Sequence, residues 1–180
     1  MQTLTVRRVF AADEARFGLK VKHRRHWSPF GCRPPWMHDD QYQWLWLYAA
    51  VEPATGQSLV LFLPHVDGAC FEAFLGQLRA FVPEPDIALV LDNSGAHNSG
   101  RVPWPQGIHK IALPPYSPEL NPAERWFEVL RKEMADRVFD TLAEMEAALT
   151  EVLRSFWDDP DILKRLTGYP WWRQAAASLL

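Results

Sequence analysis

LVLDNSGAHNS (residues 89–99) is one of two stretches that decide the fold; the other is LPPYSPELNPAERWFEVLRKEM (residues 113–134). In the first stretch, an apolar run typical of a buried strand ends at Asp92. In the second, Asn121 and Pro122 are a favoured N-cap and first helical residue, and Glu124 falls in the first turn. Because open α/β sheets place ligands at strand ends, we expect Asp92 and Glu124 to face one crevice.

A third acid lies near the start of the chain. Residues 6–12 (VRRVFAA) predict a strand that ends at Asp13. Glu14 would point to the opposite face of that strand and remains a possible substitute. Glu128, one helical turn after Glu124, is the alternative third acid. Three carboxylates on separate elements are the ligands that two divalent metal ions need for cleavage of a phosphodiester.

Each acid also has a purely structural interpretation. Asp92 starts the sequence Asp-Asn-Ser-Gly, which favours a turn. Glu124 lies three residues after Asn121, where a capping box places a glutamate. Asn93 and His97 accompany Asp92 and are candidate supporting residues, as is Asn121. His97 would contact a phosphate or orient a carboxylate, or it would simply lie on a helix surface. Taken alone, these patterns leave the alternatives open.

The remaining patterns predict an α/β fold. Residues 43–51 and 58–64 form a hairpin signal, so that with the first strand they predict a three-strand antiparallel meander. Residues 67–83 have helical spacing, with Asp67 as cap and Pro83 at the end. Two short buried strands follow at residues 87–92 and 108–114. Helices from Asn121 and from Thr141 to about Trp157 then predict a mixed sheet flanked by helices. The tail, residues 158–180, gives no clear pattern.

The bulk composition fits one globular domain over residues 1–180. The chain has 180 residues, of which 48% are hydrophobic, and this excludes disorder as the main state. It contains no run of 18 apolar residues and no apolar signal core at its start, so we expect neither a membrane span nor secretion. Cys32 and Cys70 demand no disulfide, which fits a reducing cytoplasm. His23 and His26 have no cysteine pair to complete a zinc site.

The net charge of -3 hides a basic segment at residues 16–33. This segment contains no acid and has six cations: Arg16, Lys20, Lys22, Arg24, Arg25 and Arg33. Such a cluster can contact nucleic-acid phosphates even in a chain that is acidic overall. The alternative is a solvated strand pair with basic outer positions. Trp27 and Trp36 lie beside the cluster, where they either stack on bases or pack within the loop.

Three blocks of sequence resemble the DDE catalytic domain of Tc–mariner-like bacterial insertion-sequence transposases. They are the Asp-Glu pair in AADEARFGL, the block LDNSGAHNS and the block PPYSPELNPAERWF. Arg24, Arg25, Trp27 and Gly31 match a further R-R-x-W-x-x-x-G element. The resemblance extends from about residue 6 to residue 155.

This resemblance implies a ribonuclease H-like fold and Mg²⁺-dependent DNA transposition, with Mn²⁺ able to substitute. It assigns the catalytic, metal-binding acids to Asp13, Asp92 and Glu124. The expected partners are transposon-end and target DNA, bound by a homodimer. Family members normally carry helix-turn-helix modules before the catalytic domain, whereas only about a dozen residues precede Asp13 here. We therefore expect the second frame of a split gene or a truncated copy. The alternatives are a non-catalytic remnant and another ribonuclease H-like nuclease.

Overall fold

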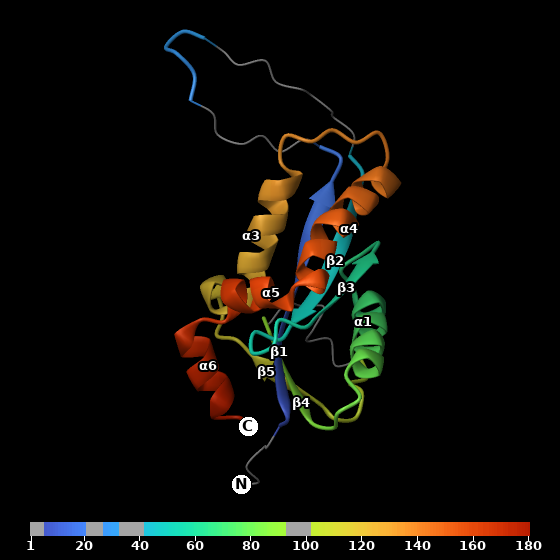
Figure 1. Cartoon of the computed structure of the whole chain (residues 1–180). Helices are drawn as coiled ribbons and strands as arrows, with labels where there is room; N and C mark the ends of the chain where they lie inside the picture. Colours follow the sequence, from blue (N-terminus) through green and yellow to red (C-terminus); the bar gives the residue numbers. More distant parts are fainter. Residues whose placement is uncertain (1–5, 21–26, 33–41, 93–101) are drawn as a thin grey trace.

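The protein is built around one five-stranded sheet with the strand order β3-β2-β1-β4-β5 (Figure 1). The computed structural model describes residues 6–20, 27–32, 42–92 and 102–180. The central strand of the sheet is β1 (Arg8–Gly18), which lies between β2 (Trp44–Val51) and β4 (Ile87–Leu91). The edges are β3 (Ser58–Leu63) and β5 (Ile108–Ala112). The sheet is therefore mixed, as the sequence predicts.

The strand directions follow from the connections. β1, β2 and β3 pair in antiparallel fashion, which confirms the predicted meander. β4 then runs parallel to β1, and β5 runs parallel to β4. The crossover from β3 to β4 carries α1 (Gly68–Phe81), because a parallel return needs a long connection.

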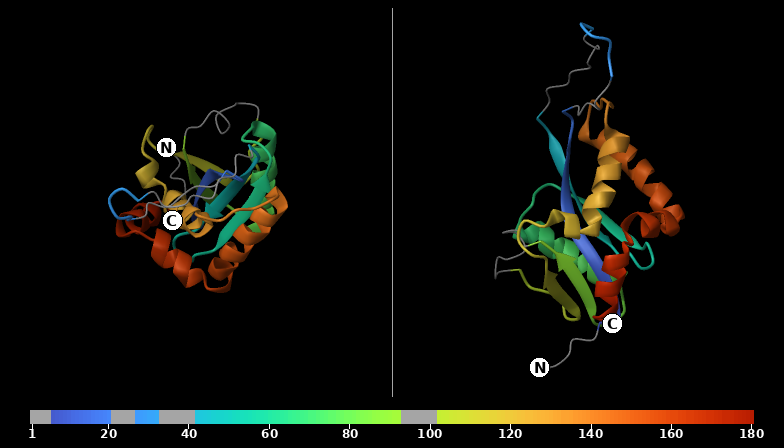
Figure 2. Two further views of the ribbon diagram at one scale, coloured as in Figure 1. Left: turned by 90° about the horizontal axis from the view of Figure 1, so that it is seen from above. Right: turned by 90° about the vertical axis from the view of Figure 1, so that its left-hand side faces the viewer.

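Helices cover both faces of the sheet, so each face has its own core (Figure 2). One face carries α1, whose side chains Phe71, Phe74, Leu75 and Leu78 are buried. The other face carries α3 (Pro122–Met134), α4 (Leu142–Asp158) and α5 (Pro160–Thr167). Trp126 of α3 is fully buried there and meets Phe156 of α4 edge to face, at 5.8 Å between ring centroids. This packing holds α3 against the central strand.

Helix starts agree closely with the sequence. The Asp67 side chain accepts a hydrogen bond from the Cys70 amide at 2.8 Å, which confirms it as the cap of α1. Thr141 accepts from the Glu144 amide at 3.2 Å at the start of α4. A short 3₁₀ turn, η1 (Pro118–Leu120), leads into α3. These caps fix the points at which each helix leaves the preceding loop.

Two regions differ from the sequence prediction. β1 does not end at Asp13 but continues to Gly18, because residues 11–18 pair with residues 44–51 of β2. The tail, which gave no pattern, forms α5 and α6 (Pro170–Ala177), and the amide of Val6 donates to the Leu179 carbonyl at 3.0 Å. In the part of the chain that the structure describes, no helix has the length and apolar content needed to cross a membrane.

Candidate active site

A groove of about 420 Å³ brings together the three acids that the sequence singles out. Asp13, Asp92 and Glu124 line it from three different elements, together with Asn121. Its other wall is the rigid segment Leu113–Ser117 and the following Pro118. Tyr116 in this wall has a φ of 57° and a fully exposed ring. The groove thus has an acidic floor and a proline-stiffened rim.

The parallel register accounts for the meeting of Asp13 and Asp92. Ala11 of β1 is paired with Val90 of β4. Two residues further along each chain, Asp13 and Asp92 are therefore neighbours on adjacent strands, which lie about 4.8 Å apart in a sheet. Asp92 directly follows the last residue of β4, at the strand end where the sequence places it. Its carboxylate is one of the charges that raise the pKa of Asp13.

Alternation along β1 decides between Asp13 and Glu14. Ala11 and Ala15 belong to the core beneath α3, so Asp13 between them faces α3 as well. Glu14 lies on the other face, where its charge adds to burial in raising the pKa of Tyr48, a core residue beneath α1. The Glu14 amide nevertheless donates to Asp13 Oδ1 at 2.8 Å. Glu14 therefore supports Asp13 through its backbone.

The Asn121 side chain ties α3 to β1 beside the acids. Its Oδ1 accepts from the Ala123 amide at 3.1 Å, which makes it the N-cap of α3. Its Nδ2 donates to the Ala12 carbonyl at 3.0 Å, one residue from Asp13. Asn121 is buried, so both bonds are shielded from water. One amide group therefore sets the position of the first turn of α3, and with it Glu124, relative to Asp13.

Glu124 and Glu128 have different surroundings. Glu124 is half-buried in the groove, and its Oε2 lies 3.5 Å from Arg131 Nη1. Glu128 points into solvent, where it forms an exposed ion pair with Arg125 at 2.8 Å. The geometry therefore favours Glu124 over Glu128 as the third acid of the groove. Sequence reasoning missed Arg131, although its position two helical turns after Glu124 places both on one side of α3.

Burial raises the pKa of Asp13 to about 8, and the negative charge of Glu124 is the next largest cause. The charges of Glu14 and Asp92 act in the same direction, while the Glu14 amide opposes them. Across the described residues, His, Cys, Asp and Glu side chains nowhere gather in a group of three or more arranged to hold a metal ion. The groove thus concentrates negative charge, but its acids are not drawn together around a common centre.

Only part of the predicted basic cluster lies in the described residues. Arg16 is on β1 and Lys20 follows it, and both are exposed. Lys22, Arg24, Arg25 and Arg33 lie outside the described residues, as do Asn93 and His97.

Known structures share this architecture. The Mos1 transposase paired-end complex with left transposon end matches with a TM-score of 0.67 and 18% identity, over 89% of this chain and 51% of that chain. The Mos1 mariner paired end complex with Mn gives 0.66 and 18%, over 89% and 52%. This chain spans about half the length of these solved relatives. The mixed sheet with its helices is therefore the ribonuclease H-like fold of transposases and integrases.

The sequence family is narrower than the fold. Residues 8–146 match the profile of the DDE superfamily endonucleases, and the chain belongs to that family. A protein from Sinorhizobium fredii, named uncharacterized protein y4pE/y4sA, is 33% identical over 98 residues, which are 53% of this chain and 73% of the relative. The resemblance inferred from the acid-bearing blocks is confirmed at the level of family and fold.

Replacing Asn121 with Asp tests the tie between α3 and β1. Aspartate caps helices as well as asparagine does, but it cannot donate to the Ala12 carbonyl. We expect Asn121→Asp to lower the free energy of unfolding by about 1 to 3 kcal/mol, measured by urea denaturation. Asp67→Asn is the matched control, because it makes the reverse exchange between a carboxylate and an amide at the exposed cap of α1. Equal effects of both changes would contradict a special role for Asn121.

The raised pKa of Asp13 predicts a pH-dependent stability in metal-free protein. The folded state keeps a proton on Asp13 up to about pH 8, whereas the unfolded chain loses it near the ordinary aspartate pKa of 3.8. Stability should therefore fall as pH rises between these values. Asp13→Asn removes this loss of stability, because asparagine does not titrate. Above pH 8, the free energy of unfolding of the variant should therefore exceed that of the parent by roughly 1 kcal/mol or more. Urea denaturation with chelator present at pH 5 and pH 8.5 measures this difference. A variant that is less stable at both pH values would refute the burial of a repelled carboxylate.

Proposed function

We propose that this chain is the catalytic domain of a DNA transposase. It would cleave phosphodiesters at transposon ends and join the resulting 3′-hydroxyl ends to target DNA. The observation that carries the proposal is the convergence of Asp13, Asp92 and Glu124 on one groove from β1, the end of β4 and the start of α3. Membership of the DDE superfamily endonucleases supports the same chemistry.

The donor set fits Mg²⁺, with Mn²⁺ as a substitute. All three groove acids offer carboxylate oxygens, which are the ligands that these hard cations prefer. Burial, and after it the negative charge of Glu124, raises the pKa of Asp13, and a bound cation would favour its charged form. Because the described residues hold no ready-made group of three ligands, the side chains must draw together on binding. On binding, the Glu124 carboxylate would leave its ion pair with Arg131 and coordinate the cation.

The residues have distinct roles in the proposed reaction. Asp13 and Asp92 would hold the cations from adjacent strands, and Glu124 would complete the site from α3. The bound metal ions would activate the attacking oxygen and stabilise the leaving oxygen. Asn121 would keep Glu124 at a fixed position relative to Asp13. Transposon-end and target DNA are the proposed substrates, with a homodimer as the assembly on DNA; a Mos1 paired-end complex contains a transposon end.

The Glu124→Gln variant separates a metal ligand from a helix cap. It keeps the size of the side chain but removes its charge. In Mg²⁺, we expect nicking of supercoiled plasmid DNA to fall at least about 100-fold. The free energy of unfolding should change by no more than about 1 kcal/mol. Nicking by the unchanged protein should also stop in chelator and in Ca²⁺.

Glu128→Gln is the control, because Glu128 lies on the same helix in an exposed ion pair. Its activity should stay close to that of the parent. Comparable losses in both variants would mean that the third ligand is assigned to the wrong helical turn. A folded parent protein without any nicking would favour the non-catalytic remnant, and preferential cutting of RNA–DNA hybrid would favour another ribonuclease H-like nuclease.

A further inference from the structure

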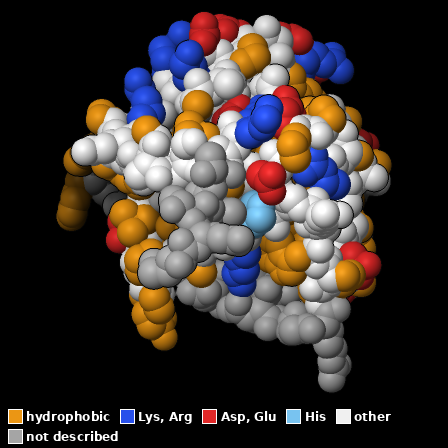
Figure 3. Space-filling view, turned by 90° about the horizontal axis from the view of Figure 1, so that it is seen from below, with side chains coloured by type: hydrophobic (Ala, Val, Ile, Leu, Met, Phe, Trp, Pro, Cys, Tyr) orange, Lys and Arg blue, Asp and Glu red, His pale blue; other side chains and the backbone are white. Residues whose placement is uncertain are grey.

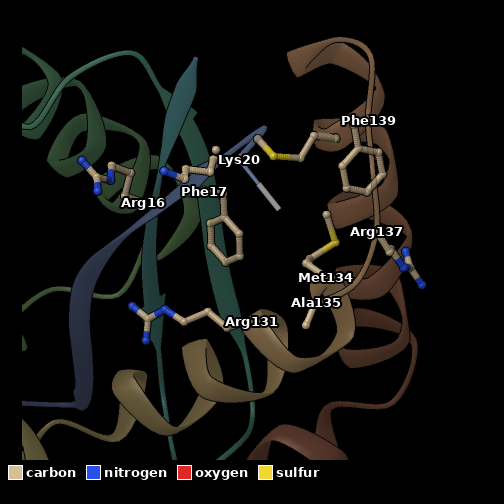
Figure 4. Close-up of a pocket in the computed structure, with 10 residues that line it drawn as sticks. Arg16, Phe17, Lys20, Arg131, Met134, Ala135, Arg137 and Phe139 are labelled. Carbon is tan, nitrogen blue, oxygen red and sulfur yellow. The ribbon is translucent and has the colours of Figure 1, made fainter. Parts of the chain in front are cut away.

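A second recess lies at the far end of β1 and α3, and its rim is basic (Figure 4). Four cations line it, namely Arg16, Lys20, Arg131 and Arg137, over an apolar floor that includes Phe17. None of the described residues that line it is acidic. In Figure 4 the charged ends of Arg16, Lys20 and Arg131 lie on one side of the Phe17 ring, whereas Arg137 points to the opposite side.

Two of these cations lie over exposed aromatic rings. The Arg16 guanidinium is 5.5 Å from the centre of the Trp44 ring, and Lys20 Nζ is 5.3 Å from that of Tyr42. Trp44 is 45% exposed and Tyr42 is 74% exposed, so these rings are not core residues. We call Arg16, Lys20, Arg131, Tyr42 and Trp44 the basic–aromatic surface. Cations beside exposed rings are the combination that binds single-stranded nucleic acid, through phosphates and stacked bases.

Arg131 adjoins both the recess and the acidic groove. Its guanidinium lies 3.5 Å from Glu124, which lines the groove. A phosphate bound at the groove acids would therefore lie directly beside Arg131, at the edge of the recess that Arg16 and Lys20 also line.

At the opposite end of the described part of the molecule, Lys110 Nζ lies 6.0 Å from the centre of the Trp104 ring, but this ring is only partly exposed. Seen from below in Figure 3, Lys and Arg side chains are interspersed with Asp and Glu. His109, for example, is paired with Asp86 at 2.9 Å. The described cations that stand beside exposed rings are thus concentrated at the end of β1 and α3.

We propose that the basic–aromatic surface binds an unpaired nucleic-acid strand. Arg16, Lys20 and Arg131 contact its phosphates, while Trp44 and Tyr42 stack on its bases. Stacking requires free base faces, so the surface selects a single strand over a duplex. The inference rests on the proposed function for one point only, that the strand continues into the groove of Asp13, Asp92 and Glu124.

Two probes separate stacking from phosphate contact. One is a fluorescent oligo-dT of about 12 nucleotides, within the range of known single-strand sites, and the other is an abasic oligomer of equal length. Anisotropy with the whole chain in chelator gives both affinities. Trp44→Ala should weaken oligo-dT binding by about 5- to 100-fold and leave abasic binding unchanged. Tyr42→Ala provides a second test at a more exposed position, should Trp44→Ala fail to fold.

The cations are tested with a matched arginine. The double variant Arg16→Ala/Arg131→Ala should weaken both oligomers and reduce the salt slope by about 1.4, or about 0.7 per lost phosphate contact. Arg137→Ala is the control, because Arg137 lines the same recess but points the other way. Its affinities should match those of the parent.

Three results would overturn the inference: equal parent affinities for the two oligomers, ring variants without effect on oligo-dT, or an Arg137→Ala loss as large as that of the double variant. Failure of the proposed function looks different. Oligo-dT binding with these variant effects, but no metal-dependent nicking, would keep the surface and refute the transposase. Metal-dependent nicking, with no preference for oligo-dT over the abasic oligomer, would keep the transposase and refute the surface.

Discussion

The side-chain amide of Asn121 is the constraint on which the groove depends. Its oxygen caps α3 and its nitrogen binds the Ala12 carbonyl of the central strand. Apolar contacts, such as those of Trp126, hold α3 against the sheet but are not directional. Two buried, directional bonds from one planar group fix its position further, because losing either would leave a polar group unpaired. Asn121 therefore sets the position of the helical turn that carries Glu124, whose own carboxylate contacts Arg131.

The groove holds negative charge at a cost to the fold. Asp13 lies in the middle of β1, and Ala11 and Ala15, two residues before and after it, belong to the core. An apolar residue at the position of Asp13 would stabilise the sheet. Burial and the adjacent acids penalise its charged form, as the raised pKa shows. A raised pKa on a buried acid beside other acids in a groove is typical of functional sites, and it supports the proposed metal-binding role of Asp13. In the proposed function, a bound cation would offset this penalty.

Local signals made most of the fold predictable. The caps at Asp67, Asn121 and Thr141 and the hairpin of β2 and β3 were all readable, because each depends on a few adjacent residues. The length of β1 was not, since Asp13 and Glu14 break its apolar run and the strand continues only through pairing with β2. The tail helices were missed for a similar reason: α5 and α6 are short and are stabilised mainly by packing against the rest of the chain.

The three acids could be chosen from sequence, but their selection over Glu14 and Glu128 needed the structure. The alternation of side chains along β1 separates Asp13 from Glu14, and helical spacing separates Glu124 from Glu128. Only the position of α3 over one face of the sheet shows which member of each pair lines the groove. The same helix connects the acidic groove to the basic surface, with Glu124 in its first turn and Arg131 in its last. The helix dipole favours an acid at the start and a cation at the end. The opposed charges that the proposed metal site and the proposed phosphate contact require are thus also charges that the dipole of α3 favours.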